Sequence, residues 1–161
     1  MNKHLFDHVN IDKAHTHVPD GSNPDADAAC AAYEQAIVDA GGVDLQLLGL
    51  GHNGHIGFNE PADVFPKATN CVDLTESTIT ANSRLFDSID DVPRQAYTMG
   101  IGTIMAAKMV LVMANGEVKA QAVHDMIYGP ITPSCQASIL QLHPNVVVVA
   151  DEAALSLCPA E

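Results

Sequence analysis

The sequence has 161 residues and a mass of 17.0 kDa, which is the usual length of one domain. Hydrophobic residues make up 47% and charged residues 17%, so the chain can bury a core and is not intrinsically disordered. The 7 Lys and Arg residues stand against 20 Asp and Glu residues, a net charge of −13. Because such a surface repels phosphate backbones and anionic lipids, we expect no nucleic-acid partner and no membrane partner.

A helix and a buried strand are predicted near the start of the chain, after a polar, turn-rich beginning. Asn23 and Pro24 suit the N-cap and the first position of a helix, which we predict over residues 28–40. The glycines at 41–42 end this helix. The apolar run 43–50 that follows is typical of a buried parallel strand.

Two further buried strands alternate with helical segments in the rest of the chain. We expect strands at 109–114 and 146–150, helices at 99–107, 117–127 and 137–142, and a polar helix–loop segment at 73–93. This alternation predicts an α/β fold, with a Rossmann-like parallel sheet flanked by helices. No linker divides the chain, so we expect a single α/β domain over residues 1–161.

The four cysteines, Cys30, Cys71, Cys135 and Cys158, are widely spaced and form no CxxC pair. A chain of this size does not need disulfides, so we expect reduced thiols. Residues 1–10 carry charged side chains where a signal peptide has an apolar core. We therefore predict a cytoplasmic protein.

A glycine-rich loop directly after the first predicted strand carries the most informative residues. Residues 51–61 read GHNGHIGFNEP, at the carboxyl end of a strand, where ligands of open α/β sheets bind. Gly51 and Gly54 permit tight turns and a close approach of the backbone to a ligand. The glycine spacing matches the dinucleotide motif GxGxxG, but Pro61 leaves no room for the long helix that such a site requires.

His55 in this loop is the candidate for proton transfer, because an imidazole titrates near neutral pH. Asn53 and Glu60 are close enough in sequence to orient the ring, and a carboxylate partner is expected to raise the pKa of His55. The alternatives are an exposed histidine without a role and a metal site that includes His52. Because the glycines disfavour a helix that would align the two histidines, we expect no metal.

The loop resembles the glucosamine-6-phosphate deaminase (isomerase) family. The related 6-phosphogluconolactonases share the glycine–histidine part but lack the ending over residues 58–61. Similar sequence continues at residues 5–9, 81–86, 98–104, 116–120, 138–143 and 151–154. The resemblance implies the conversion of glucosamine 6-phosphate and water to fructose 6-phosphate and ammonia in amino-sugar catabolism, with a small amino-sugar phosphate as ligand and no cofactor.

The resemblance also implies roles for particular residues. The family's ring-opening histidine falls on His55 and its glutamate partner on Glu60. The residue two positions before the histidine is an acid in some members and Asn53 here, which is expected to raise the pKa of His55 less than an acid would. The cations that bind the substrate phosphate fall on Arg84 and on Lys119, which we predict in the first turn of a helix.

The family fold is larger than the one this sequence predicts. Its N-terminal part carries a phosphate loop and an Asp-Glu-Tyr motif, whose first acid moves the proton, and neither pattern occurs here. Three alternatives follow: residues upstream of Met1 complete the enzyme, the chain binds sugar phosphates without turnover, or it is one part of a split enzyme. In each case we expect a truncated fold with an exposed apolar sheet edge, and hence either a homo-oligomer (a dimer) or packing within the chain that compensates for the missing strands.

Overall fold

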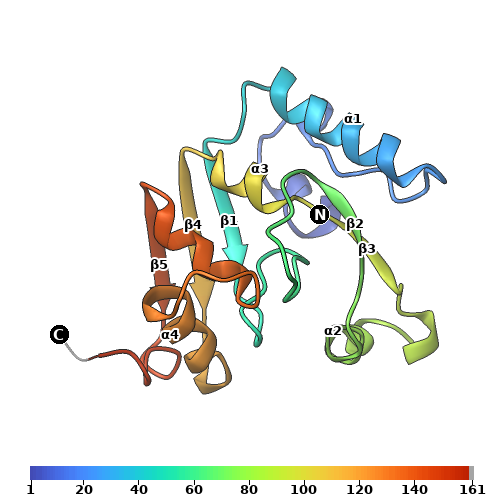
Figure 1. Ribbon diagram of the computed structural model, residues 1–161. Helices are drawn as coiled ribbons and strands as arrows, with labels where there is room; N and C mark the ends of the chain where they lie inside the picture. The colour runs from blue at the N-terminus through green and yellow to red at the C-terminus, as the bar shows by residue number, and fades with distance from the viewer. Residues whose placement is uncertain (160–161) are drawn as a thin grey trace.

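Three parallel strands form the centre of the fold in the computed structural model, which describes residues 1–159 (Figure 1). The strands β1 (Leu45–Gly49), β4 (Met109–Ala114) and β5 (Val146–Ala150) lie side by side in that order. In the register of the first pair, Leu48 lies opposite Val112. All three strands were predicted, and the parallel sheet is confirmed. Because the strands run in the same direction, the loops after β1 and β4 leave the sheet at the same edge.

Helices cover one face of this sheet. The predicted helices are present as α3 (Ile101–Met105), α4 (Ala120–Tyr128) and the 3-10 helix η7 (Gln136–Leu142). The main core consists of buried side chains from strands and helices, among them Leu48, Val110, Val112, Ile101, Ile104, Val123, Met126 and Leu140. A layer of helices packed on a parallel sheet confirms the predicted α/β class.

The opposite face of the sheet is bare. Successive strand residues point to opposite faces, and the side chains that alternate with the buried ones are more than a third exposed at Leu45, Leu47, Met113, Val147 and Val149. Parallel sheets are usually covered on both faces. The exposed apolar surface is therefore a whole face of the sheet, where the sequence had suggested only an edge.

A second sheet of two antiparallel strands, β2 (Asn70–Asp73) and β3 (Gln95–Thr98), lies apart from the first. The chain between these strands forms α2 (Glu76–Asn82) and the 3-10 helices η4 (Ser83–Leu85) and η5 (Ile89–Asp91). The predicted helix–loop segment over residues 73–93 is thus confirmed. The two strands were not predicted, because each has four residues and mixes polar with apolar side chains.

Helix α1 (Ala26–Asp39) lies beside β2 and β3 in Figure 1. It begins after Asp25, whose carboxylate accepts a hydrogen bond from the Ala28 N–H at 3.0 Å. The prediction that Asn23 is the N-cap is wrong, because its side chain instead accepts from the Asp25 N–H at 2.9 Å and forms a turn before the helix. Gly41 takes φ 88° just after the helix and allows the chain to leave it, as predicted.

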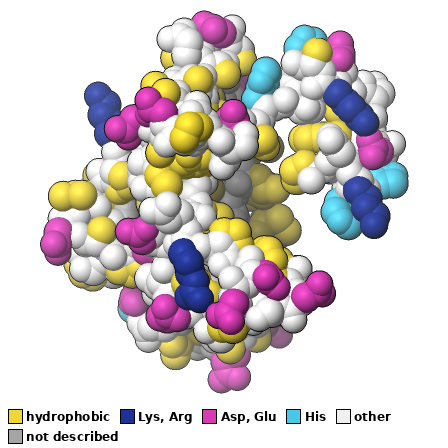
Figure 2. Space-filling model, turned by 90° about the vertical axis from the view of Figure 1, so that its right-hand side faces the viewer, with side chains coloured by type: hydrophobic (Ala, Val, Ile, Leu, Met, Phe, Trp, Pro, Cys, Tyr) yellow, Lys and Arg dark blue, Asp and Glu magenta, His cyan; other side chains and the backbone are white. Residues whose placement is uncertain are grey.

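The first residues of the chain form three short 3-10 helices, η1 (Asn2–His4), η2 (Phe6–His8) and η3 (Lys13–His15). Figure 2 shows a hollow in the middle of one side of the molecule, with hydrophobic side chains around it and acidic side chains scattered over the remaining surface. None of the helices within residues 1–159 has both the length and the apolar character needed to cross a membrane.

Candidate active site

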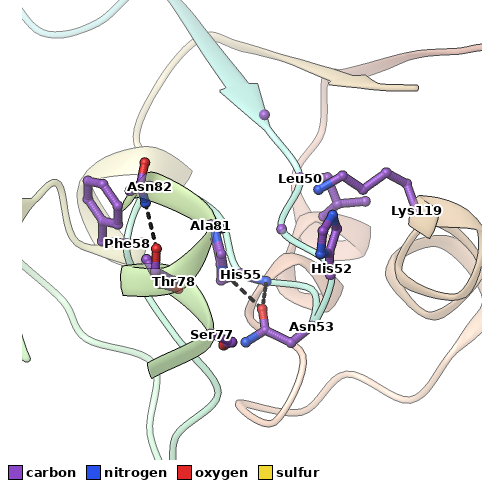
Figure 3. Close-up of a pocket in the computed structure, with 13 residues that line it drawn as sticks. Leu50, His52, Asn53, His55, Phe58, Ser77, Thr78, Ala81, Asn82 and Lys119 are labelled. Carbon is purple, nitrogen blue, oxygen red and sulfur yellow. Dashed lines mark hydrogen bonds between the residues drawn. The ribbon is translucent and has the colours of Figure 1, made fainter. Parts of the chain in front are cut away.

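A cavity of about 600 Å³ opens at the edge where β1 and β4 end. Its floor is the glycine–histidine loop, which we define as residues 50–61. Figure 3 shows its two walls: α2 on one side, and on the other the segment that precedes α4 and carries Lys119. Three segments that are distant in sequence therefore meet at the edge where ligands of parallel sheets bind.

The glycine–histidine loop is held by its own backbone. The Gly51 N–H donates to the carbonyl oxygen of His55 at 2.8 Å, and the Ala137 N–H of η7 donates to the carbonyl oxygen of Gly54 at 2.9 Å. A Cβ at position 51 would overlap the imidazole ring, and one at position 54, where φ is 79°, would lie 2.5 Å from Cys135 Sγ. Glycine is thus required at both positions by the protein's own side chains, independently of any ligand.

Three predicted residues meet in this loop, and their hydrogen bonds determine the tautomer of His55. Glu60 Oε2 accepts from Asn53 Nδ2 at 2.7 Å, which turns Asn53 Oδ1 toward the imidazole. His55 Nδ1 lies 2.8 Å from this amide oxygen and 3.3 Å from Glu60 Oε2. Because both neighbours accept, Nδ1 carries the proton. In the neutral ring, Nε2 then has the free lone pair that can accept a proton.

Burial dominates the charge state of His55. Burial lowers its pKa, the adjacent Glu60 carboxylate raises it, and Lys119 and His52 lower it further, so that the pKa lies below its ordinary value. The predicted rise in the pKa of His55 is therefore wrong, because desolvation of the charged ring outweighs the attraction of the carboxylate. Burial therefore favours the neutral form of the ring.

The pKa of Glu60 is lowered, whereas the pKa of an isolated buried carboxyl group is raised. Burial raises its pKa, but hydrogen bonds from Thr78 and Asn53, together with the nearby His55 and Thr75, bring the pKa below its ordinary value. Its side chain is 10% exposed. The site therefore places a largely buried carboxylate, whose ionised form is favoured, next to an imidazole whose neutral form is favoured.

Only one of the two predicted phosphate-binding cations lies at the cavity. Lys119 ends the 3-10 helix η6 (Glu117–Lys119) directly before α4, and its side chain lines the cavity. Burial lowers its pKa. Arg84 lies in η4, where it is exposed and does not line the cavity.

Several polar residues at the cavity were not found from the sequence. Ser77, Thr78 and Asn82 come from α2 and line the wall opposite Lys119 (Figure 3). The sequence motif around Arg84 lies at the end of this segment and did not identify them. The Thr75-x-x-Thr78 spacing could have indicated a polar start of the helix, because it places two hydroxyls within one helical turn. Within residues 1–159, no three His, Cys, Asp or Glu side chains form a group that could hold a metal ion.

A parallel α/β sheet with a glycine–histidine loop and a lysine at its carboxyl edge describes the class to which this protein belongs. A family profile described as glucosamine-6-phosphate isomerases/6-phosphogluconolactonase matches residues 1–148. The chain belongs to this family.

The most informative relatives are named glucosamine-6-phosphate deaminase. The protein of Clostridium perfringens (strain SM101 / Type A) is 55% identical over 157 residues, which cover 98% of this chain and 65% of that protein. The protein of Geobacillus sp. (strain WCH70) is 50% identical over 161 residues, which cover 100% of this chain and 64% of that protein. The chain thus spans about 65% of the length of the curated relatives that it matches.

Solved structures agree with this assignment. A structure described as a monomeric glucosamine-6-phosphate deaminase matches with a TM-score of 0.93 and 44% identity, over 98% of this chain and 65% of that chain. The 6-phosphogluconolactonase of Thermotoga maritima matches with a TM-score of 0.66 and 22% identity, over 93% of this chain and 62% of that chain. The second likeness shows the shared fold alone.

Proposed function

We propose that this chain takes part in the conversion of glucosamine 6-phosphate and water to fructose 6-phosphate and ammonia, and supplies the residues that open the sugar ring and bind its phosphate. One observation carries the proposal: the His55 imidazole, oriented through Nδ1 by an amide and a largely buried carboxylate, lines a cavity that also presents a lysine. The relatives at 50% and 55% identity, which are named for this deamination, support it. A cytoplasmic location is part of the same proposal.

His55 is proposed to open the sugar ring. Ring opening takes a proton from the anomeric hydroxyl and delivers one to the ring oxygen. Nε2 accepts the first proton and returns it to the second oxygen, while Asn53 and Glu60 keep Nδ1 protonated and the ring in place. Glu60 stabilises the imidazolium that exists between the two transfers.

The substrate phosphate is proposed to bind Lys119 and Arg84. Lys119 already faces the cavity, and its desolvation strengthens its attraction to an anion. In the sequence, only Ser83 stands between Arg84 and Asn82, which lines the cavity. We propose that the segment after α2 closes over the ligand and brings the guanidinium to the phosphate.

The decisive experiment compares the purified chain with a joined protein, in which the chain is fused to the N-terminal part of a relative that carries the Asp-Glu-Tyr motif. Ammonia release from glucosamine 6-phosphate, with fructose 6-phosphate as the second product, is expected of the joined protein, and neither protein is expected to hydrolyse 6-phosphogluconolactone above background. The double variant Arg84→Ala, Lys119→Ala is expected to lose most of the binding of glucosamine 6-phosphate, measured by calorimetry. Lys3→Ala, Lys13→Ala is the matched control, because both lysines are exposed in the first fifteen residues.

A second candidate is binding of sugar phosphates without turnover. Within residues 1–159, no carboxylate lines the cavity. In the family, the first acid of the Asp-Glu-Tyr motif moves the proton between carbon atoms, and this motif does not occur in the sequence. Saturable binding without ammonia release would support this candidate. Ammonia release would contradict it, and the absence of both binding and turnover would contradict both candidates.

Self-association is proposed through the bare face of the sheet, with a second copy of this chain as the partner. Sedimentation is expected to show a dimer, because exposed apolar faces of this kind usually mark an interface. The variant Leu47→Lys, Val149→Lys is expected to sediment as a monomer. Val38→Lys, which changes an exposed residue of α1, serves as the control. A wild-type monomer at all concentrations would contradict this proposal.

A further inference from the structure

The carboxylate of Glu60 is held from two sides. On the loop side, Oε2 accepts from Asn53 Nδ2 and lies 3.3 Å from His55 Nδ1. On the other side, Oε1 accepts from the hydroxyl of Thr78 and lies 3.2 Å from the hydroxyl of Thr75. Each oxygen of this carboxylate therefore contacts a different structural element.

The two threonines belong to the start of α2. Thr75 is the N-cap, and its Oγ1 accepts from the Thr78 N–H at 3.3 Å. Thr78 is buried, and its Oγ1 lies 3.1 Å from that of Thr75. Because a hydroxyl has one proton, Thr78 donates to Glu60 while its own oxygen accepts from Thr75. The carboxylate is thus aligned by the helix itself.

The same helix forms one wall of the cavity. Ser77 and Asn82 of α2 line the side that faces the glycine–histidine loop (Figure 3). Any displacement of α2 from the loop would therefore alter the cavity wall and remove the Thr78 hydroxyl donor from Oε1 in one step. A carboxylate that loses such donors is less stable as an anion and is no longer fixed beneath the imidazole.

We propose that Thr78 is a positioning residue that, through Glu60, sets the orientation and charge of the His55 imidazole, so that the seating of α2 against the loop controls proton transfer. The proposal rests on the role given to His55 in the proposed function. The charged or titratable groups that face His55 are Glu60 and His52 from the loop and Lys119 from η6. Of these, only Glu60 is hydrogen-bonded by α2.

The test compares hydroxyl-deleting and hydroxyl-retaining variants in the whole chain. NMR titrations of the Glu60 carboxyl carbon and the His55 ring are recorded for wild type, Thr78→Val, Thr78→Ser and Thr80→Val. Thr80 is the matched control, since it lies exposed in the same helix. Thr78→Val is expected to raise the pKa of Glu60 and shift the titration of His55, Thr78→Ser to restore both, and Thr80→Val to change neither.

The kinetic counterpart is a fall in kcat for Thr78→Val of about tenfold or more, as expected for loss of a hydrogen bond to a charged group, with KM unchanged. An unchanged Glu60 titration in Thr78→Val, or an equal change in Thr80→Val, would overturn the proposal. If the valine variant does not fold, Thr78→Ala takes its place. The titrations do not depend on turnover, so a joined protein that releases no ammonia would contradict the proposed function, and NMR would still decide this inference.

Discussion

His55→Gln is expected to lower kcat for ammonia release from glucosamine 6-phosphate by about 10²–10⁴-fold, the usual contribution of a positioned general acid–base group. Glutamine is close to histidine in size and still carries an amide that can hydrogen-bond to Asn53, so the loop keeps its shape. It has no group that titrates near neutral pH, so the proton of the anomeric hydroxyl has no acceptor. Binding of the substrate phosphate is expected to change little, because the group that faces it, Lys119, is unaltered.

The measurement is a steady-state assay of ammonia release at saturating substrate, with substrate affinity followed separately by calorimetry. His15→Gln is the matched control, because His15 is exposed at the end of η3 and lies outside the residues that line the cavity. If His55→Gln retained more than a tenth of the wild-type kcat, His55 could not be the residue that opens the sugar ring.

Ile56→Ala is expected to lower the free energy of unfolding by about 2–5 kcal/mol, the range for removing a fully buried isoleucine side chain. Ile56 is 0% exposed and belongs to the main core cluster with Leu50, Val112 and Ala137. Its side chain anchors the middle of the glycine–histidine loop beneath the cavity. The cavity left by alanine cannot collapse easily, because the backbone on both sides is held by hydrogen bonds to η7 and within the loop.

Urea denaturation followed by circular dichroism measures this loss directly. Val38→Ala is the control, since Val38 is 67% exposed in α1 and its truncation is expected to change stability by less than about 0.5 kcal/mol. An equal and small effect of both substitutions would mean that the loop is not anchored in the core. A large effect of Ile56→Ala alone would confirm that the core supports the candidate site.

The sheet and its covering helices could be predicted from the sequence because burial leaves a clear pattern. The runs at 109–114 and 146–150 are apolar throughout, as strands with few polar neighbours must be. The pair β2 and β3 had no such pattern, since its partner residues are 22 to 28 positions apart in the chain, such as Val72 and Ala96 at 24. Pairing at that separation leaves no local periodicity in the sequence.

The candidate site was only partly predictable for the same reason. The motif identified His55, Asn53 and Glu60, which lie within eight residues and therefore meet through local turns. It did not identify Thr78, which reaches Glu60 only because α2 packs against the loop. It also predicted the wrong direction for the pKa of His55, because the degree of burial depends on everything that packs around the ring.

Composition and local pattern alone determined the α/β class, the three parallel strands and the loop that carries the imidazole, and the resemblance of that loop to known sequences indicated the family. Those features depend on neighbours in sequence and on the periodicity of apolar residues. Only the tertiary structure decided that one face of the sheet is bare, that Lys119 and not Arg84 lies at the cavity, and that α2 holds Glu60. These depend on contacts between segments far apart in the chain, whose free energy is determined by packing and desolvation in three dimensions.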